Sequence, residues 1–141
     1  MDEKIRIFSL KDRKGLGELT MHTGAVTALQ FYRDAFLLSA SEDCTICIWR
    51  IEDWNCVHIL GGHKASINDI SIHPSGKLAL SVSKDKTMKL WNLVEGRLGF
   101  TRRLSSIAEK VVWSAEGEVY MIMFYKVVQV YDASDNSLIH T

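Results

Sequence analysis

The sequence predicts an all-β protein made of repeated four-stranded antiparallel sheets, and three observations lead to this prediction. Short runs of about seven β-branched, aromatic and aliphatic residues alternate with charged or glycine-containing turns along the chain. No apolar stripe with the period of a helix persists for about three turns. The pattern also repeats after about forty residues, which is the period of a β-propeller blade. We therefore expect about three and a half four-stranded blades, as part of a seven-bladed propeller.

The repeat is clearest when residues 22–51 are aligned with residues 63–93. Four chemically distinct residues keep nearly the same register in both segments, at offsets of 41, 42, 42 and 42 positions. We call them the first quartet, which is His22, Ser39, Asp43 and Trp49, and the second quartet, which is His63, Ser81, Asp85 and Trp91. Chance agreement of this kind is improbable, so we interpret the chain as a repeat protein.

Each of the two intact copies contains four expected strands, separated by turn residues. The expected strands are 25–31, 35–41, 45–51 and 56–62 in the first copy, and 66–73, 77–83, 87–93 and 98–104 in the second.

Weaker copies flank this pair. Residues 2–8 align with residues 43–49, and residues 111–132 follow the second copy but lack its His, Ser and Asp. The predicted units are therefore the end of one blade at 1–10, blades at 11–51 and 52–93, a degenerate blade at 94–132, and the start of the next outer strand at 133–141.

The quartets have two interpretations, because a serine, a histidine and an aspartate can also form a nucleophilic triad. In a blade, the His precedes the innermost strand, the Ser lies on the second strand, the Asp in the next turn and the Trp on the third strand. The four side chains can then satisfy one another's hydrogen bonds. Ser81 lies among apolar residues inside a strand rather than on an exposed elbow, and the same set occurs twice. We therefore predict structural networks and no catalytic residue.

Three other segments suggest sites that we interpret as structural. Cys44 and Cys47 form a C-x-x-C pair, but a second pair that would complete a zinc site is missing, and a strand would point the two thiols to opposite faces. Residues 121–125 are expected to form a strand buried between neighbouring blades. Residues 73–76, with the sequence His-Pro-Ser-Gly, are expected to form a turn. The sequence thus predicts no metal and no cofactor.

The charges give little support for a nucleic-acid partner, because seventeen basic side chains are balanced by seventeen acidic ones. Basic residues nevertheless gather at residues 11–14 and 97–103, where contacts with RNA phosphates or with a protein partner are conceivable. The candidates are Lys11, Lys14, Arg97, Arg102 and Arg103. Acidic residues elsewhere dilute any continuous stripe, so solvated loops are the alternative interpretation.

The sequence lacks the features of a secreted or membrane protein. Its first twenty residues are charged throughout and do not form a signal peptide, and no apolar run approaches the ~20 residues of a membrane helix. Three cysteines are too few and too unevenly spaced for a disulfide framework. We therefore expect a soluble intracellular protein that has no membrane partner and no small-molecule substrate.

The repeat resembles that of the WD40-repeat family over essentially the whole chain. Within that family, residues 45–57 and 71–97, followed by the degenerate stretch 111–118, resemble the PAK-interacting proteins, which are ribosome-assembly factors related to the Mak-type proteins. The resemblance implies a non-enzymatic scaffold that acts in assembly of the large (60S) ribosomal subunit, in the nucleus and nucleolus.

The resemblance also implies partners. These are p21-activated protein kinases, which such a protein would bind and negatively regulate, and ribosome-assembly factors. The alternatives are a propeller that contacts pre-rRNA in pre-ribosomal particles, or an adaptor in another complex.

The length is too small for a closed ring, because 141 residues supply only about half of a seven-bladed propeller. Open ends would leave apolar blade faces and strand edges in water. We therefore expect a segment of a longer protein. The alternative is a short form that pairs with copies of itself or with a partner.

Overall fold

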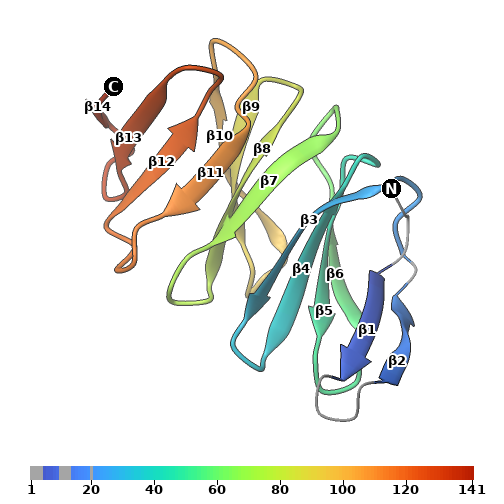
Figure 1. The fold of residues 1–141 in the computed structure, drawn as a ribbon. Coiled ribbons are helices and arrows are strands. Elements are labelled where there is room, and N and C mark those ends of the chain that lie inside the picture. The colour runs from blue at the N-terminus through green and yellow to red at the C-terminus, as the bar shows by residue number, and fades with distance from the viewer. Residues whose placement is uncertain (1–4, 10–13, 20) are drawn as a thin grey trace.

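The computed structural model describes residues 5–9, 14–19 and 21–141 of the chain. In these residues it contains only strands, turns and loops, arranged as three four-stranded antiparallel sheets and one two-stranded sheet (Figure 1). The predicted all-β fold is therefore confirmed. The described part of the chain holds no helix of the length and apolar character that crossing a membrane requires.

Each four-stranded sheet pairs its strands in chain order. The first sheet consists of β3 (Val26–Tyr32), β4 (Phe36–Ser41), β5 (Ile46–Arg50) and β6 (Cys56–Leu60). The second consists of β7 (Ile67–Ile72), β8 (Leu78–Ser83), β9 (Thr87–Asn92) and β10 (Arg97–Arg103). The third consists of β11 (Lys110–Trp113), β12 (Val119–Met123), β13 (Val128–Asp132) and β14 (Leu138–His140). The separate pair consists of β1 (Ile5–Ser9) and β2 (Lys14–Leu19).

The sequence repeat and the sheet differ in where they begin. The predicted unit 52–93 begins with β6 and ends with β9, whereas the second sheet begins with β7 and ends with β10. The offset arises because the unit is defined by Trp91, which lies on the third of the four strands. The outermost strand of each sheet is therefore supplied by the next repeat.

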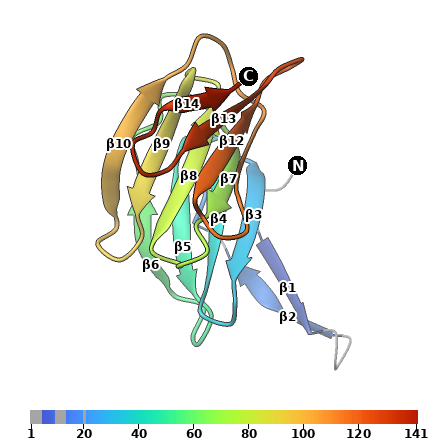
Figure 2. The ribbon, with the colours of Figure 1, turned by 90° about the vertical axis from the view of Figure 1, so that its left-hand side faces the viewer.

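The sheets stack face to face. Figure 1 shows the three sheets side by side, and in Figure 2 the third sheet lies in front of the second. The innermost strands are tied together across the stack: the Thr27 hydroxyl donates to the backbone oxygen of Ile67 at 2.6 Å, and the Trp113 amide donates to Ser71 Oγ at 3.1 Å. These bonds join residues 40 and 42 positions apart, so the repeat register also sets the register between sheets.

Two apolar clusters fill the spaces between the three four-stranded sheets. The cluster between the first and second sheets includes Leu38, Ile46, Ile70 and Trp91. The cluster between the second and third sheets includes Leu80, Met88, Tyr120 and Ile122. Burial of this apolar surface is what holds neighbouring sheets together.

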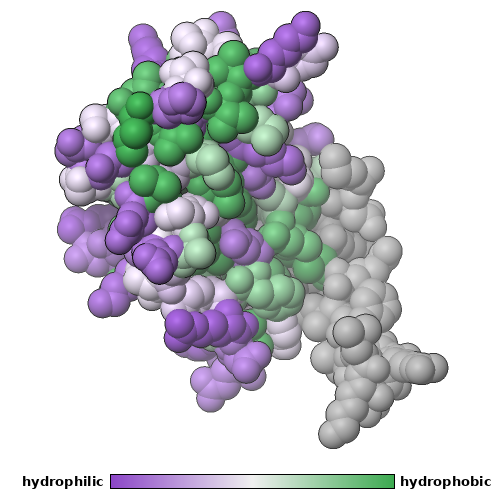
Figure 3. All heavy atoms as spheres, turned by 60° about the vertical axis from the view of Figure 1, so that its left-hand side comes forward, coloured by the Kyte–Doolittle hydropathy of each residue, from purple (hydrophilic) through white to green (hydrophobic). Residues whose placement is uncertain are grey.

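Segment 121–125 departs from the prediction of a buried strand, because only one of its faces is buried. Ile122 and Phe124 point into the cluster between the sheets, whereas Met121, Met123 and Tyr125 are exposed. Side chains alternate along a strand, and within the described residues no further sheet covers the outer face of the third one. Figure 3 shows the apolar side chains that gather on this side of the molecule.

Candidate functional site

The structure brings the second quartet together in one chain of hydrogen bonds. His63 Nδ1 lies 2.9 Å from Asp85 Oδ2, and His63 Nε2 lies 2.6 Å from Ser81 Oγ. The indole N–H of Trp91 donates to the same serine oxygen at 2.8 Å. The residues come from the loop before β7, from β8, from the turn after it and from β9. The network therefore fixes the three inner strands of the sheet to one another.

The first quartet has the same geometry in the first sheet. The corresponding distances are 3.0 Å from His22 Nδ1 to Asp43 Oδ2, 2.7 Å from His22 Nε2 to Ser39 Oγ, and 2.9 Å from Trp49 Nε1 to Ser39 Oγ. Two sheets of different sequence thus contain the same polar arrangement.

The protonation state of His63 follows from its hydrogen-bond partners. A carboxylate only accepts hydrogen bonds, so His63 Nδ1 carries the proton and Nε2 accepts the hydroxyl proton of Ser81. Burial lowers the pKa of His63, although the adjacent Asp85 opposes this shift. Burial would raise the pKa of Asp85, but hydrogen bonds from Thr87, the Lys64 amide and His63 outweigh it and lower that pKa to about 2. Near neutral pH the pair is a neutral imidazole beside an ionised carboxylate.

The order of atoms is that of a Ser-His-Asp triad, but the surroundings of the serine differ from those of a nucleophile. Ser81 is 0% exposed, so a substrate carbonyl has no access to its oxygen. That oxygen already accepts the Trp91 N–H while its proton is held by His63. What this arrangement can do chemically is to satisfy buried polar groups and hold strands in register.

An aromatic cluster takes the place of the quartet in the third sheet. Ile122 occupies the position of the serine and Tyr131 that of the tryptophan. Tyr131 stacks on Tyr120 with 5.3 Å between ring centroids, and Trp113 meets Tyr120 edge-on at 5.5 Å. The Arg102 guanidinium lies 4.5 Å from the centroid of Tyr131. This cluster was not predicted from the sequence, although the gain of aromatic residues where the polar ones are lost is a signal for it.

The cysteines form no site that the geometry supports. Cys44 lies in the turn between β4 and β5 with a φ of +73°, so the strand alternation expected for Cys44 and Cys47 does not apply to it. Burial raises the pKa of the Cys47 thiol to about 12, with a further contribution from Cys56, so the thiol stays protonated. In the described ranges, no three His, Cys, Asp or Glu side chains are grouped so that they could hold a metal ion.

The basic candidates do not converge on one surface of the described structure. Lys11 lies outside the described residues, and Lys14 is the first residue of β2. Arg97 and Arg103 lie at opposite ends of the seven-residue strand β10, roughly 20 Å apart along an extended chain.

The arginines also differ in their partners. Arg97 pairs with Glu95, and Arg102 donates to the backbone oxygen of Asn136 while it stacks on Tyr131. Of the three arginines, Arg103 alone lines a described pocket that contains further cationic side chains.

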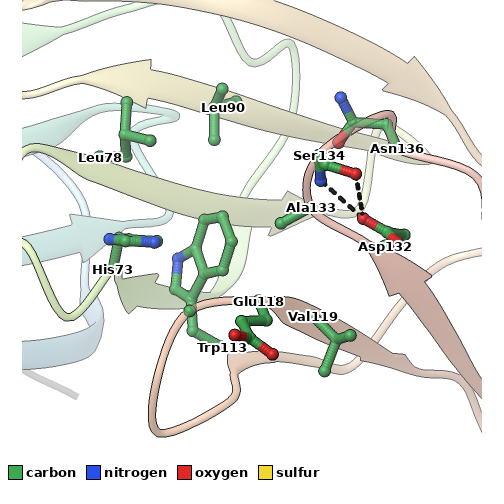
Figure 4. A pocket seen from close by; sticks show the side chains of 11 residues that line it. His73, Leu78, Leu90, Trp113, Glu118, Val119, Asp132, Ala133, Ser134 and Asn136 are labelled. Carbon is green, nitrogen blue, oxygen red and sulfur yellow. Dashed lines mark hydrogen bonds between the residues drawn. The ribbon is translucent and has the colours of Figure 1, made fainter.

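A pocket of about 560 Å³, which we call the junction pocket, opens between the second and third sheets (Figure 4). Trp113 lies at its centre in this view, and the acidic side chains of Glu118 and Asp132 stand on its rim. The remaining lining residues are His73, Leu78, Leu90, Gly117, Val119, Ala133, Ser134 and Asn136. Apolar walls with a few polar groups are typical of sites that accept a ligand or a partner side chain.

The junction pocket exists because three side chains are smaller than their counterparts between the first and second sheets. At the earlier junction Tyr32 stacks on Phe36 at 5.2 Å, and Leu93 is buried in the core. The repeat places His73, Leu78 and Ala133 at these three positions one sheet later. The same framework is therefore filled at one junction and hollow at the next.

Comparison with known proteins identifies the repeat. The family model described as "WD domain, G-beta repeat" matches residues 13–50 and 54–92. The matched segments contain both quartets, so the residues that form the two hydrogen-bonded networks fall within the recognised repeats.

Three relatives match the chain over nearly all of its length. They are "p21-activated protein kinase-interacting protein 1-like" of Xenopus laevis, with 42% identity over 99% of this chain, "Protein MAK11" of Saccharomyces cerevisiae, with 38% identity over 93%, and "Shk1 kinase-binding protein 15" of Schizosaccharomyces pombe, with 30% identity over 97%. The matches cover 39%, 36% and 41% of these relatives, so the chain spans about two fifths of their length.

Proposed function

This chain belongs to the WD40-repeat family, and from that premise we propose that it is a non-enzymatic scaffold for protein interactions. Its partners, on this proposal, are a p21-activated protein kinase, which it negatively regulates, and factors that assemble the large (60S) ribosomal subunit in the nucleus and nucleolus. The observation that carries the proposal is the duplicated quartet, because its Ser, His and Asp are committed to holding the strands of a sheet together. The surfaces left for function are then the loops and pockets at the sheet ends.

The kinase part of the proposal is supported by the relatives. The Xenopus laevis relative is named as a kinase-interacting protein and the Schizosaccharomyces pombe relative as a kinase-binding protein. Identity of 42% and 30% over nearly the whole of this chain favours a similar arrangement of loops in the shared blades. The ribosomal part is supported by the resemblance of residues 71–97 to the ribosome-assembly branch of the family and by the match to Protein MAK11.

The junction pocket is the contact that we assign to a protein partner. Its apolar walls fit a bulky apolar side chain, and Glu118 and Asp132 on the rim favour a neighbouring lysine or arginine. A flat loop surface would offer no comparable anchor for a single side chain.

Titration calorimetry tests the proposal. It measures the binding of this chain to the purified regulatory region of a p21-activated kinase. We expect saturable binding that is weakened when His73→Tyr and Ala133→Leu fill the junction pocket with the residue types found at the earlier junction. Val94→Lys, at an exposed position on another turn, is the control and should bind as the unaltered chain does. Absence of binding by the unaltered, folded chain would contradict the kinase role.

The ribosomal role has its own test. Depletion of the protein should reduce large ribosomal subunits relative to small ones in a sucrose gradient. Restoration of that protein with Ser81→Ala, which removes the serine of the second quartet, tests catalysis at the same time. Recovery of subunit levels is expected at a temperature where the variant is folded, because the serine performs no reaction.

A further inference from the structure

A second pocket lies at the other end of the second sheet. It has a volume of about 360 Å³ and is formed by the loop before β7, the turn between β8 and β9, the first half of β9 and the end of β10. It is lined by Gly62, Lys64, Asp85, Thr87, Lys89, Thr101 and Arg103. The junction pocket opens at the ends joined by the β7–β8 turn, so the two pockets belong to opposite rims of the stack.

Lys89 is the unusual member of this second pocket. It is 8% exposed, and its ammonium donates to the hydroxyl of Thr101 at 2.9 Å. Within the described residues no carboxylate lies within ion-pairing distance of that ammonium. An ammonium has three protons to donate, and a buried charge is costly unless an opposite charge compensates it.

The one carboxylate in the pocket is already committed. Asp85 Oδ2 accepts from His63 Nδ1 and from the Lys64 amide, and Oδ1 accepts from the amide and the hydroxyl of Thr87. Four donors therefore surround its two oxygens. Lys64 and Arg103 are exposed and add two further cations at the pocket mouth. The pocket as a whole attracts an anion.

The first sheet provides an internal comparison, because its quartet is the same and its surroundings are not. The positions that correspond to Lys64, Lys89, Thr101 and Arg103 are occupied by Thr23, Cys47, Ile59 and Gly61. Every one of these four replacements is neutral. The hydrogen-bonded framework therefore does not require the cations, and they are a feature of the second sheet that stability of the quartet leaves unexplained.

We propose that this pocket binds the phosphate of a phosphorylated serine or threonine in a protein partner, an inference that rests on the proposed scaffold function. A phosphomonoester carries up to two negative charges and three terminal oxygens, which match an ammonium at depth and two cations at the mouth. A phosphomonoester lies at the end of a side chain, so it can enter a pocket. An RNA phosphate lies within a continuous backbone and is best bound by an extended cationic track, whereas Lys64, Lys89 and Arg103 surround a single pocket.

The test uses the full chain and the blocked peptide acetyl-Gly-phosphoserine-Gly amide, with chemical shifts of the Gly62 amide and the Thr87 amide as reporters. We expect both signals to shift with the phosphorylated peptide and to stay unchanged with its unphosphorylated form. Lys89→Met keeps the length of the side chain and removes its charge, and it should weaken binding about tenfold or more. Lys77→Met, at an exposed lysine near the opposite rim, is the matched control and should bind as the unaltered chain does.

We expect the Lys89→Met chain to fold, because the substitution removes a buried charge that no carboxylate compensates in the described structure. A Lys89→Met chain that melts at or above the temperature of the unaltered chain, and no longer binds the phosphopeptide, supports the proposal. Equal affinity of the Lys89→Met and unaltered chains would overturn it. Tighter, Lys89-dependent binding of a uridine oligonucleotide would also overturn it, in favour of RNA.

The result of the phosphopeptide test can be distinguished from the result of the kinase-binding test. A chain that binds the kinase region but ignores the phosphopeptide retains the scaffold function and loses the phosphate site. A chain that binds the phosphopeptide but no kinase region retains the site and loses the kinase as its partner.

Discussion

A single buried hydroxyl connects three strands of the second sheet. Ser81 donates to His63 and accepts from Trp91, and His63 in turn donates to Asp85. Ser81, His63 and Trp91 are shielded from water, so none of the three can replace a lost partner with solvent. At the scale of single residues, the stability of a blade therefore depends on the completeness of the quartet.

Ser81→Ala tests this dependence. The substitution leaves the indole N–H and the imidazole Nε2 without a partner in the interior, so we expect a loss of about 1–3 kcal/mol in the free energy of unfolding. Urea denaturation followed by tryptophan fluorescence measures it. Ser105→Ala, at an exposed serine, is the control and should change the free energy by less than about 0.5 kcal/mol. Equal stability of the two variants would contradict a bracing role.

The pH dependence of stability follows from the shifted pKa values of the same network. Because burial lowers the pKa of His63 below 6.5, the unfolded chain binds a proton at a higher pH than the folded chain does. The contribution of His63 to the free energy of unfolding is therefore fully present above about pH 6.5 and decreases as the pH falls below it. The Asp85 pKa of about 2 adds a second loss as the pH falls from about 4 towards 2.

His63→Gln isolates the first of these two losses. The unfolding free energy of the variant should be lower at neutral pH and should change less between about pH 6.5 and 5 than that of the unaltered chain. Urea titrations at a series of pH values measure this slope, and the same substitution at the exposed His140 is the control. A slope that persists in the His63→Gln chain would assign the proton uptake to another group.

At the scale of the element, the turn between β11 and β12 carries a constraint from the neighbouring sheet. Gly117 has a φ of +76°, and a Cβ atom at this position would overlap the imidazole of His73. Gly76 holds the equivalent place one sheet earlier, with a φ of +74° and the ring of Tyr32 against it. An aromatic ring at the end of β3, and another just after the end of β7, thus covers the turn glycine of the next sheet.

Gly117→Ala should therefore destabilise the protein by more than about 1 kcal/mol, because it combines an unfavourable φ with a steric overlap. Gly61→Ala is the matched control, since nothing lies within 4 Å of its added methyl group. Thermal melts of the two variants provide the comparison. Similar melting temperatures would contradict the close contact between His73 and the turn.

The elements themselves were largely predictable, because their signals are local. The expected strand 77–83 corresponds to β8, and the expected turn 73–76 lies between β7 and β8. The expected directions of the Cys44 and Cys47 thiols assumed a strand at both residues, and the positive φ of Cys44 has no marker in the sequence. The quartets were predictable for a different reason: their residues are polar, recur at a fixed offset and come from neighbouring strands.

At the scale of the whole molecule, the features that sequence reasoning missed are those built from distant segments. The junction pocket depends on the sizes of His73, Leu78 and Ala133, which come from separate elements of two sheets. The second pocket likewise combines Lys64 and Lys89 with Arg103, of which only Arg103 was a candidate from the sequence. The two pockets form where the repeat register places such residues together.

Stacking buries the inner face of the third sheet and leaves its outer face exposed. Val112, Met121, Met123 and Val128 are between 38% and 46% exposed and lie on paired positions of β11, β12 and β13. The inner face of the same sheet is buried against the second sheet. A contiguous apolar face of this kind promotes association in water, because covering it removes apolar surface from the solvent.

We therefore expect the 141-residue chain to associate as its concentration rises, and the combined change Met121→Lys with Met123→Lys to prevent this. The two lysines place like charges on the face and make its burial costly, while Ile122 and the inner core stay intact. Sedimentation velocity over a concentration series measures the mass of the species. Val94→Lys adds a charge at a turn that is 67% exposed and should leave the association unchanged. If the doubly substituted chain sediments as the unaltered one does, the association uses a different surface.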